Sequence, residues 1–427
     1  MLTIAGVLSL LTWLYLFAAH GNFWRTGKIV AQSPLVRAAS LRIAVIIPAR
    51  DEADVVGCCV TSLLHQVGGH SLHIFLVDDA SSDSTAQAAS EAAQTAGKSE
   101  MLTVIEGRPL VPGWSGKLWA VEQGVQQARA LNPDFFLLTD ADIEHALDSV
   151  ATLAAVAQAG GYDLASCMVR LQCRTLAERM LVPAFVFFFL KLYPPAWIAN
   201  PRRKTAGAAG GSILIRPEAL ERAGGIESIR GQIIDDCALA RRVKQSDGKV
   251  WLGLFTATCS LRSYNSLAAI GRMISRTAFN QLQHSNLLLL LSLLGLGIAY
   301  LVPPALLFFS RQLVPALPYG IGQSVHAILQ HHGGKQPKPH WVLHGTRARC
   351  RYRKSSNWLR QPIQSPQRPR LRGTSGREQR LRVKIELSVQ PLDEYLGHVC
   401  AKELLVRKGS NSAAARRCIQ CLESHAV

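Results

Sequence analysis

Between residues 42 and 139, short apolar runs rich in β-branched residues alternate with segments of helical periodicity. The expected strands are 42–48, 72–78, 102–106 and 135–139, and the expected helices between them are 52–66, 84–96 and 117–131. A repeated strand–helix order places helices on both faces of a mostly parallel sheet. Together with strand-like runs at 163–171 and 212–216, this order predicts an α/β fold with a doubly wound, parallel or mixed sheet. Such sheets bind ligands at the carboxyl ends of their strands.

Two adjacent acids, Asp78 and Asp79, stand at the end of the second expected strand, after the apolar run LHIFLV. Adjacent carboxylates at a strand end are unfavourable unless they pair with a cation or face a ligand. Capping of the next helix is the alternative, and it explains the nearby Asp83 better than it explains the pair. A carboxylate at this position can accept hydrogen bonds from the base or ribose hydroxyls of a nucleotide.

The motif Asp140-Ala141-Asp142 follows the fourth expected strand, FFLLT. In an extended segment the side chains of residues i and i+2 point to the same side. Two carboxylates placed in this way make a hard-oxygen site for Mg²⁺ or Mn²⁺, and such an ion can neutralise a diphosphate. A pair of surface turn aspartates is the alternative.

Two further motifs lie at the same edge of the expected sheet. Pro48 ends the first strand and Glu52 opens the helix that follows, where an acid can also simply favour the helix N-terminus. Lys117 ends the segment GWSGK, which is not a Walker phosphate loop because the first glycine and the final Ser/Thr of that pattern are missing. We expect Lys117 to contact a ligand from the start of a helix, with a solvent-exposed lysine as the alternative.

The second half of the chain contributes a glycine-rich segment and a pair of acids. Small residues at 207–211 (GAAGG) allow the backbone to approach a ligand closely, or simply form a tight packing loop. Asp235 and Asp236 lie at an expected loop-to-helix junction, where they can act as helix caps. One of these carboxylates beside an acceptor hydroxyl can instead serve as a general base.

The order VIIPARDE, VDDASSDST, GWSGK, DAD, GAAGG and IIDDCALARR resembles that of the family 2 glycosyltransferases over about residues 40–310. The run from LYPPAWIANPRRK to IIDDCALARRVK is more narrowly similar to the hopanoid-biosynthesis-associated glycosyltransferases of the HpnB type. The resemblance implies a GT-A-like fold and an inverting transfer of one sugar from a nucleotide-sugar, for which we expect a UDP-sugar. It also implies a hopanoid as the acceptor.

The resemblance assigns roles to several acids. It implies that Asp79 helps to bind the nucleotide, that Asp140 and Asp142 hold the metal and the diphosphate, and that Asp236 is the catalytic base. Asp235 stands where the family has a glutamate and is expected to support Asp236. The predicted donor site comprises Pro48, Glu52, Asp78, Asp79, Lys117 and Asp140. Residues 273–277 keep only the arginine of the Q/R-x-x-R-W motif of membrane-associated relatives, which favours a single transfer over polymerisation.

Two uncharged apolar stretches, 2–19 and 287–309, predict membrane anchors. Lys and Arg follow the first stretch and none precedes it, so the positive-inside rule places the catalytic part in the cytoplasm, on a multi-pass inner-membrane protein. The amphipathic segment 267–282 is expected at the membrane surface, which suits a lipid acceptor. The predicted parts are an anchor at 1–20, a GT-A domain at 41–265, an interfacial helix at 266–284, a transmembrane helix at 287–309 and a tail at 311–427.

The net charge of +18 is concentrated in the tail. Residues 1–310 carry 26 Lys and Arg against 23 Asp and Glu, whereas residues 311–427 carry 21 against 6. The tail has no sustained periodicity, which predicts disorder or an out-of-frame segment, and makes nucleic-acid binding a weak alternative. The other two hypotheses are a nucleotidyltransferase of similar fold and a non-catalytic membrane protein that binds nucleic acid through the tail.

Overall fold

The computed structural model describes residues 2–26, 40–264, 266–282 and 285–309, all within the first of two compact units of the chain, Met1–Tyr352. The predicted tail, 311–427, lies outside the described residues, as do the side chains of residues 276–280. The interpretations of the tail and of the arginine at 276 therefore remain predictions.

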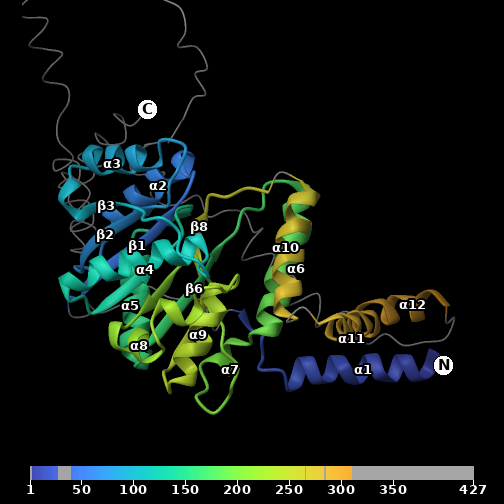
Figure 1. The fold of residues 1–427 in the computed structure, drawn as a ribbon. Helices are drawn as coiled ribbons and strands as arrows, with labels where there is room; N and C mark the ends of the chain where they lie inside the picture. The colour runs from blue at the N-terminus through green and yellow to red at the C-terminus, as the bar shows by residue number, and fades with distance from the viewer. Residues whose placement is uncertain (1, 27–39, 265, 283–284, 310–427) are drawn as a thin grey trace, which may run out of the picture. The chain divides into compact units, whose positions relative to one another are not determined.

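An eight-stranded sheet forms the centre of the domain (Figure 1), with the strand order β3-β2-β1-β4-β7-β6-β8-β5. The strands are β1 (Arg42–Ala49), β2 (Ser71–Asp78), β3 (Leu102–Glu106), β4 (Phe135–Leu138), β5 (Ile143–Glu144), β6 (Leu164–Arg170), β7 (Ile213–Ile215) and β8 (Val250–Ser260). Strands β1 to β4 are parallel, whereas β7 runs antiparallel to β4 and β6. All six predicted strands are therefore confirmed, and the sheet is mixed.

The chain changes direction across the sheet between β1 and β4. From β1 the strands proceed outward through β2 to β3, and β4 then returns to the other side of β1. A doubly wound sheet has its ligand crevice at such a switch point, outside the carboxyl ends of the strands. Pro48 near the end of β1 and Thr139 just after β4 lie at this point.

Helices cover both faces of the sheet. One core contains α2 (Ala53–Leu64), α3 (Thr85–Thr95) and α5 (Ser149–Gly160), and the other contains α4 (Gly116–Ala128), α8 (Pro217–Arg222) and α9 (Asp235–Gln245). Alternate residues of β1 serve the two cores, with Val45 in the first and Ile46 in the second. Helix α4 packs closely on the sheet at Gly124, where an added Cβ would lie 2.6 Å from Ile46 Cγ2.

The elements α5, β5 and β8 are not among those that the sequence pattern predicts. Strand β8 is an almost continuous apolar run because β6 and β5 flank it on both sides, so it lacks the polar alternation of a half-exposed strand. Helix α5 consists almost entirely of small and apolar residues and therefore has no clear polar face. Strand β8 matters for function, because it leads directly into one side of the site.

Three apolar helical segments lie outside these layers. Helix α1 (Leu2–Ala18) has 17 residues, about 26 Å, which is shorter than the roughly 20 residues that cross a bilayer. Helices α11 (Asn286–Leu296) and α12 (Val302–Phe309) are joined by a π-helical turn, Gly297–Leu301. Trp13 of α1 donates from Nε1 to the carbonyl of Ala299, in the π-helical turn, at 2.7 Å. Helix α1 therefore runs beside the segment formed by α11, this turn and α12 (Figure 1).

Two stretches of the described chain, Leu176–Ile198 and Asn286–Leu306, are long and apolar enough to cross a membrane by length and composition alone. The first contains α6 (Leu176–Leu192) and α7 (Pro195–Ile198), and half of it is buried inside the protein. We therefore treat it as part of the domain. The second is almost fully exposed and corresponds to the predicted anchor 287–309. Helix α10 (Leu267–Gln281) confirms the expected helix before it.

Candidate active site

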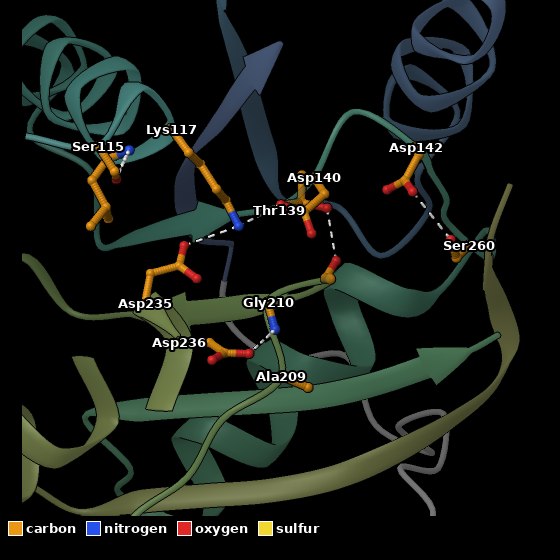
Figure 2. Close-up of polar contacts among 12 residues, drawn as sticks. Ser115, Lys117, Thr139, Asp140, Asp142, Ala209, Gly210, Asp235, Asp236 and Ser260 are labelled. Atoms are coloured by element: carbon orange, nitrogen blue, oxygen red, sulfur yellow. Dashed lines mark hydrogen bonds and ion pairs between the residues drawn. The ribbon is translucent and has the colours of Figure 1, made fainter. Parts of the chain in front are cut away.

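A small pocket opens at the switch point between β1 and β4. Pro48 and Asp140 line it from the strand ends, and Lys117 reaches it from the start of α4. Asp235 and Asp236, in the first turn of α9, form the opposite wall beside Gly210. Elements that are distant in the sequence therefore bring five predicted residues to one place: Pro48, Lys117, Asp140, Asp235 and Asp236. Figure 2 shows the last four of them.

Lys117 joins the two acidic walls of this pocket. Its Nζ lies 2.9 Å from Asp140 Oδ1 and 3.0 Å from Asp235 Oδ2. Removal from water lowers the pKa of Lys117, but the two carboxylates raise it by more than burial lowers it. The side chain is therefore an ammonium. Removal from water also raises the pKa of Asp140, and Lys117 opposes that shift. The pocket therefore contains a fixed cation between two acids.

Asp236 is held by backbone N–H groups at the inner end of the pocket. Its Oδ2 accepts from Gly210 N at 2.9 Å, and its Oδ1 accepts from Cys237 N at 2.6 Å. Removal from water and the adjacent Asp235 raise the pKa of Asp236 to about 6. A carboxylate with this pKa is ionised at neutral pH and is a stronger base than an ordinary aspartate.

The expectation that Asp140 and Asp142 point to the same side is wrong for the described conformation. Strand β4 ends at Leu138, and residues 141–142 form a turn, so the alternation of an extended strand does not apply. Asp142 lies apart from Lys117 in Figure 2. Its Oδ2 accepts from Arg262 Nε at 3.0 Å and from Ser260 Oγ at 3.3 Å.

Arg262 is the residue at this site that sequence reasoning missed. It follows the unpredicted strand β8 and pairs with both Asp142 and Glu52. Glu52 precedes the first residue of α2 without capping it through its side chain. Partial burial raises the pKa of Glu52, and Arg262 opposes that shift. The two acids on this side of the site therefore share one guanidinium as their ion-pair partner.

Asp78 and Asp79 have different environments. Asp78 accepts from the backbone N–H of Ser81 at 3.0 Å and from its hydroxyl, so it organises the turn after β2. The carboxylate of Asp79 lies 3.5 Å from Arg50 NH1. A Cβ at Gly116 would lie only 2.7 Å from Asp79 Oδ2, which explains a glycine at the start of α4. Of the predicted pair, Asp79 is the better candidate for a ligand contact.

The side chains at the pocket fit a divalent ion only in part. No group of three or more His, Cys, Asp or Glu side chains suited to a metal occurs among the described residues. Mg²⁺ and Mn²⁺ sites in phosphate-transfer proteins, however, use one or two carboxylates and complete the shell with substrate phosphates and water. Asp140 offers such a carboxylate in the pocket, whereas Asp142 is engaged by Arg262.

Comparison with solved structures shows distant likenesses. A mannosyltransferase from Pyrobaculum calidifontis, solved with GDP-Man and Mn²⁺, is 18% identical, with a TM-score of 0.47 over 79% of this chain and 94% of its own. The glucosyl-3-phosphoglycerate synthase of Mycobacterium tuberculosis is 17% identical, with a TM-score of 0.35 over 57% and 81%. With TM-scores this low, neither likeness says anything about the donor or acceptor of this chain. No curated protein matches the sequence significantly.

The family comparison is more direct. The model of glycosyl transferase family 2 matches residues 44–224, from β1 to just beyond α8. The match includes Asp79, Lys117 and Asp140, and it ends before Asp235 and Asp236. The chain therefore carries a glycosyl transferase family 2 domain at residues 44–224, and the protein is an enzyme, a glycosyltransferase.

Proposed function

We propose that this enzyme moves one sugar, with inversion, from a nucleotide-sugar to a hydroxyl group of a lipid. The observation that carries the proposal is the pocket in which Asp236, with a pKa of about 6, lies opposite Asp140 and Lys117. A base and a phosphate-binding side are needed on opposite sides of a sugar that undergoes direct displacement. In the pocket, Asp140 and the base Asp236 lie on different walls, and Lys117 lies between Asp140 and Asp235.

The chemistry follows from the roles of the residues. Asp79, just after β2, pairs with Arg50, just after β1, and we assign this pair to the nucleoside; we assign Lys117, which contacts Asp140, to the diphosphate. Mg²⁺ or Mn²⁺ held at Asp140 would neutralise the departing nucleoside diphosphate. Asp236 accepts the proton of the acceptor hydroxyl as its oxygen bonds to the anomeric carbon. Attack from the side opposite the leaving group inverts the anomeric configuration.

The lipid acceptor is proposed from the apolar helices. Helix α1 exposes Leu8, Leu11 and Leu14, and α11 exposes a similar row of leucines. The two segments run antiparallel, because Gly6 lies against Leu306 while Trp13 lies against Ala299. A bilayer is the natural environment for such a pair, with the basic segment after α1 on the cytoplasmic side. The hopanoid acceptor and the UDP-sugar rest on the sequence resemblance alone.

A donor panel tests the proposal. Membranes containing the full chain are incubated with UDP-, GDP- and dTDP-sugars, and lipid products are followed by mass spectrometry. We expect a glycosylated lipid, release of nucleoside diphosphate and loss of product with EDTA. The anomeric configuration of the product, determined by NMR, must be opposite to that of the donor. Release of pyrophosphate from a sugar phosphate and a nucleoside triphosphate would instead identify a nucleotidyltransferase.

A further inference from the structure

Lys117 occupies a position that helix preference does not explain. It lies in the first turn of α4, whose N-terminus is capped by Ser115 through a hydrogen bond from Leu118 N. The positive end of the helix dipole disfavours a cation there. The two carboxylates that contact Nζ, at 2.9 and 3.0 Å, offset this penalty, so the lysine is held by the pocket and not by the helix.

The proposed function assigns a second role to each of the two carboxylates that contact Lys117. Asp140 is the carboxylate assigned to the divalent ion, and Asp235 is adjacent to the base, Asp236. Lys117 Nζ lies 2.9 Å from Asp140 Oδ1, so a divalent ion on the same carboxylate would be close to the ammonium, and the two like charges would repel each other. The two cations therefore compete for Asp140.

We propose, on the basis of that function, that Lys117 is an internal counter-cation that holds the place of the divalent ion until the donor arrives. In the donor-free enzyme its Nζ pairs with both Asp140 and Asp235. When the nucleotide-sugar brings the ion to Asp140, Lys117 leaves that carboxylate and contacts the diphosphate. Lysine suits this exchange because its charge is carried on a flexible four-carbon stem with three rotatable donors.

The exchange predicts how ion and donor binding depend on each other. A divalent ion alone must displace Lys117 without compensation, so its affinity for the donor-free protein is low. With donor present, the displaced ammonium gains the diphosphate as a partner, so the two ligands bind cooperatively. The acids of the pocket therefore have a cation beside them both before and after the donor binds.

The test measures Mn²⁺ binding, not activity. The full chain in detergent is titrated with Mn²⁺ without nucleotide, followed by electron paramagnetic resonance of the free ion. Lys117→Met should bind Mn²⁺ about tenfold more tightly than wild type, because one opposing charge is removed from Asp140. Lys117→Arg keeps the charge and should stay near wild type. Lys249→Met is the matched control, because this exposed lysine precedes β8, at the opposite end of the strand from Ser260.

A second titration, with UDP and GDP at saturating Mn²⁺, should show weaker nucleoside diphosphate binding by Lys117→Met. Unchanged or weaker Mn²⁺ binding by a folded Lys117→Met overturns the inference. Asp140→Asn separates this failure from that of the proposed function. If Asp140→Asn loses Mn²⁺-dependent nucleotide binding, the donor site stands without the exchange. If it binds both normally, the donor site itself is wrong.

Discussion

Two carboxylates are held by backbone N–H groups in the first turns of two helices, one at α6 and one at α9. Glu178 of α6 is fully buried and accepts from Arg174 N, Thr175 N and Tyr264 N at 2.8, 2.9 and 2.7 Å. Asp236 of α9 accepts from two backbone N–H groups and lines an open pocket. Both carboxylates accept hydrogen bonds from backbone N–H groups, but their surroundings shift their pKa values in opposite directions.

The difference lies in what surrounds the negative charge. Burial raises the pKa of Glu178, but the N–H groups of Thr175, Tyr264 and Arg174 outweigh it, so its pKa is lowered overall. At Asp236, loss of water and the neighbouring Asp235 win over the two N–H bonds, and the pKa rises to about 6. Glu178 is therefore a stable anion with a structural role, whereas Asp236 is a stronger base than an ordinary aspartate.

The largest expected effect is that of Asp236→Asn on turnover. The change keeps the shape and removes the basicity, so turnover should fall by about 10²–10⁴-fold with donor affinity nearly unchanged. Steady-state rates and calorimetry of donor binding on the same preparation measure both quantities. If Asp236 only capped α9, asparagine would replace it well, and a folded variant with near-normal turnover would contradict the base assignment.

The pH dependence of turnover is the second expected effect. The base works only as a carboxylate, so the rate should fall about tenfold for each pH unit below a pKa of about 6 and level off above it. In Asp236→Asn this limb should disappear. A wild-type profile that stays flat down to pH 5, measured with the protein still folded, would show that no group with this pKa controls the rate.

The parallel half of the fold could be predicted because each strand carried its own signal. Apolar runs ended by Pro48 or followed by acids located β1, β2 and β4 to within a residue or two. The pocket followed, because the carboxyl ends of parallel strands meet at one edge. The acid pair at 235–236 could be placed there only through the family pattern, since α9 is distant in sequence and its position depends on packing.

The other side of the site could not be predicted in the same way. Arg262 has no local motif, and its position depends on β8, whose apolar run carries no alternation. The turn at residues 141–142 separates Asp142 from Asp140, which an i, i+2 rule cannot foresee. One available signal was overlooked: Thr175 and Glu178 have the spacing of a capping box, which marks the true start of α6.

Glu178→Gln is expected to affect stability more than chemistry. It removes the charge from three hydrogen bonds, which should lower the free energy of unfolding by roughly 1.5–3 kcal/mol at pH 7. Because the folded pKa is lowered, this stabilisation is present above the unfolded pKa of about 4.5 and is lost as pH falls below it. Denaturant titrations at pH 7 and pH 4 should therefore show a smaller difference between variant and wild type at the lower pH.

The stability of Asp236→Asn should change in the opposite direction. The raised pKa means that the folded protein binds the proton more tightly than the unfolded chain does, so the ionised form destabilises the fold above pH 6. The variant should thus unfold at a higher temperature than wild type at pH 8, with the gain shrinking towards pH 5. A lower unfolding temperature at pH 8 would show that the two backbone N–H bonds stabilise the charge of Asp236 as they do that of Glu178.

The smallest expected effect separates the two halves of the capping box. Thr175 accepts from Glu178 N at 3.1 Å, a neutral bond at the start of α6. Thr175→Ala removes this bond and the hydrogen bond between the Thr175 hydroxyl and the Glu178 carboxylate, and it should cost about 1 kcal/mol, whereas Thr175→Ser keeps the hydroxyl and should cost little. Turnover per folded molecule should stay near wild type in both, because Thr175 is not one of the residues that line the pocket. A loss of turnover in Thr175→Ala without loss of stability would mean that this end of α6 takes part in catalysis. The contrast between a structural acid at α6 and a reactive acid at α9 would then fail.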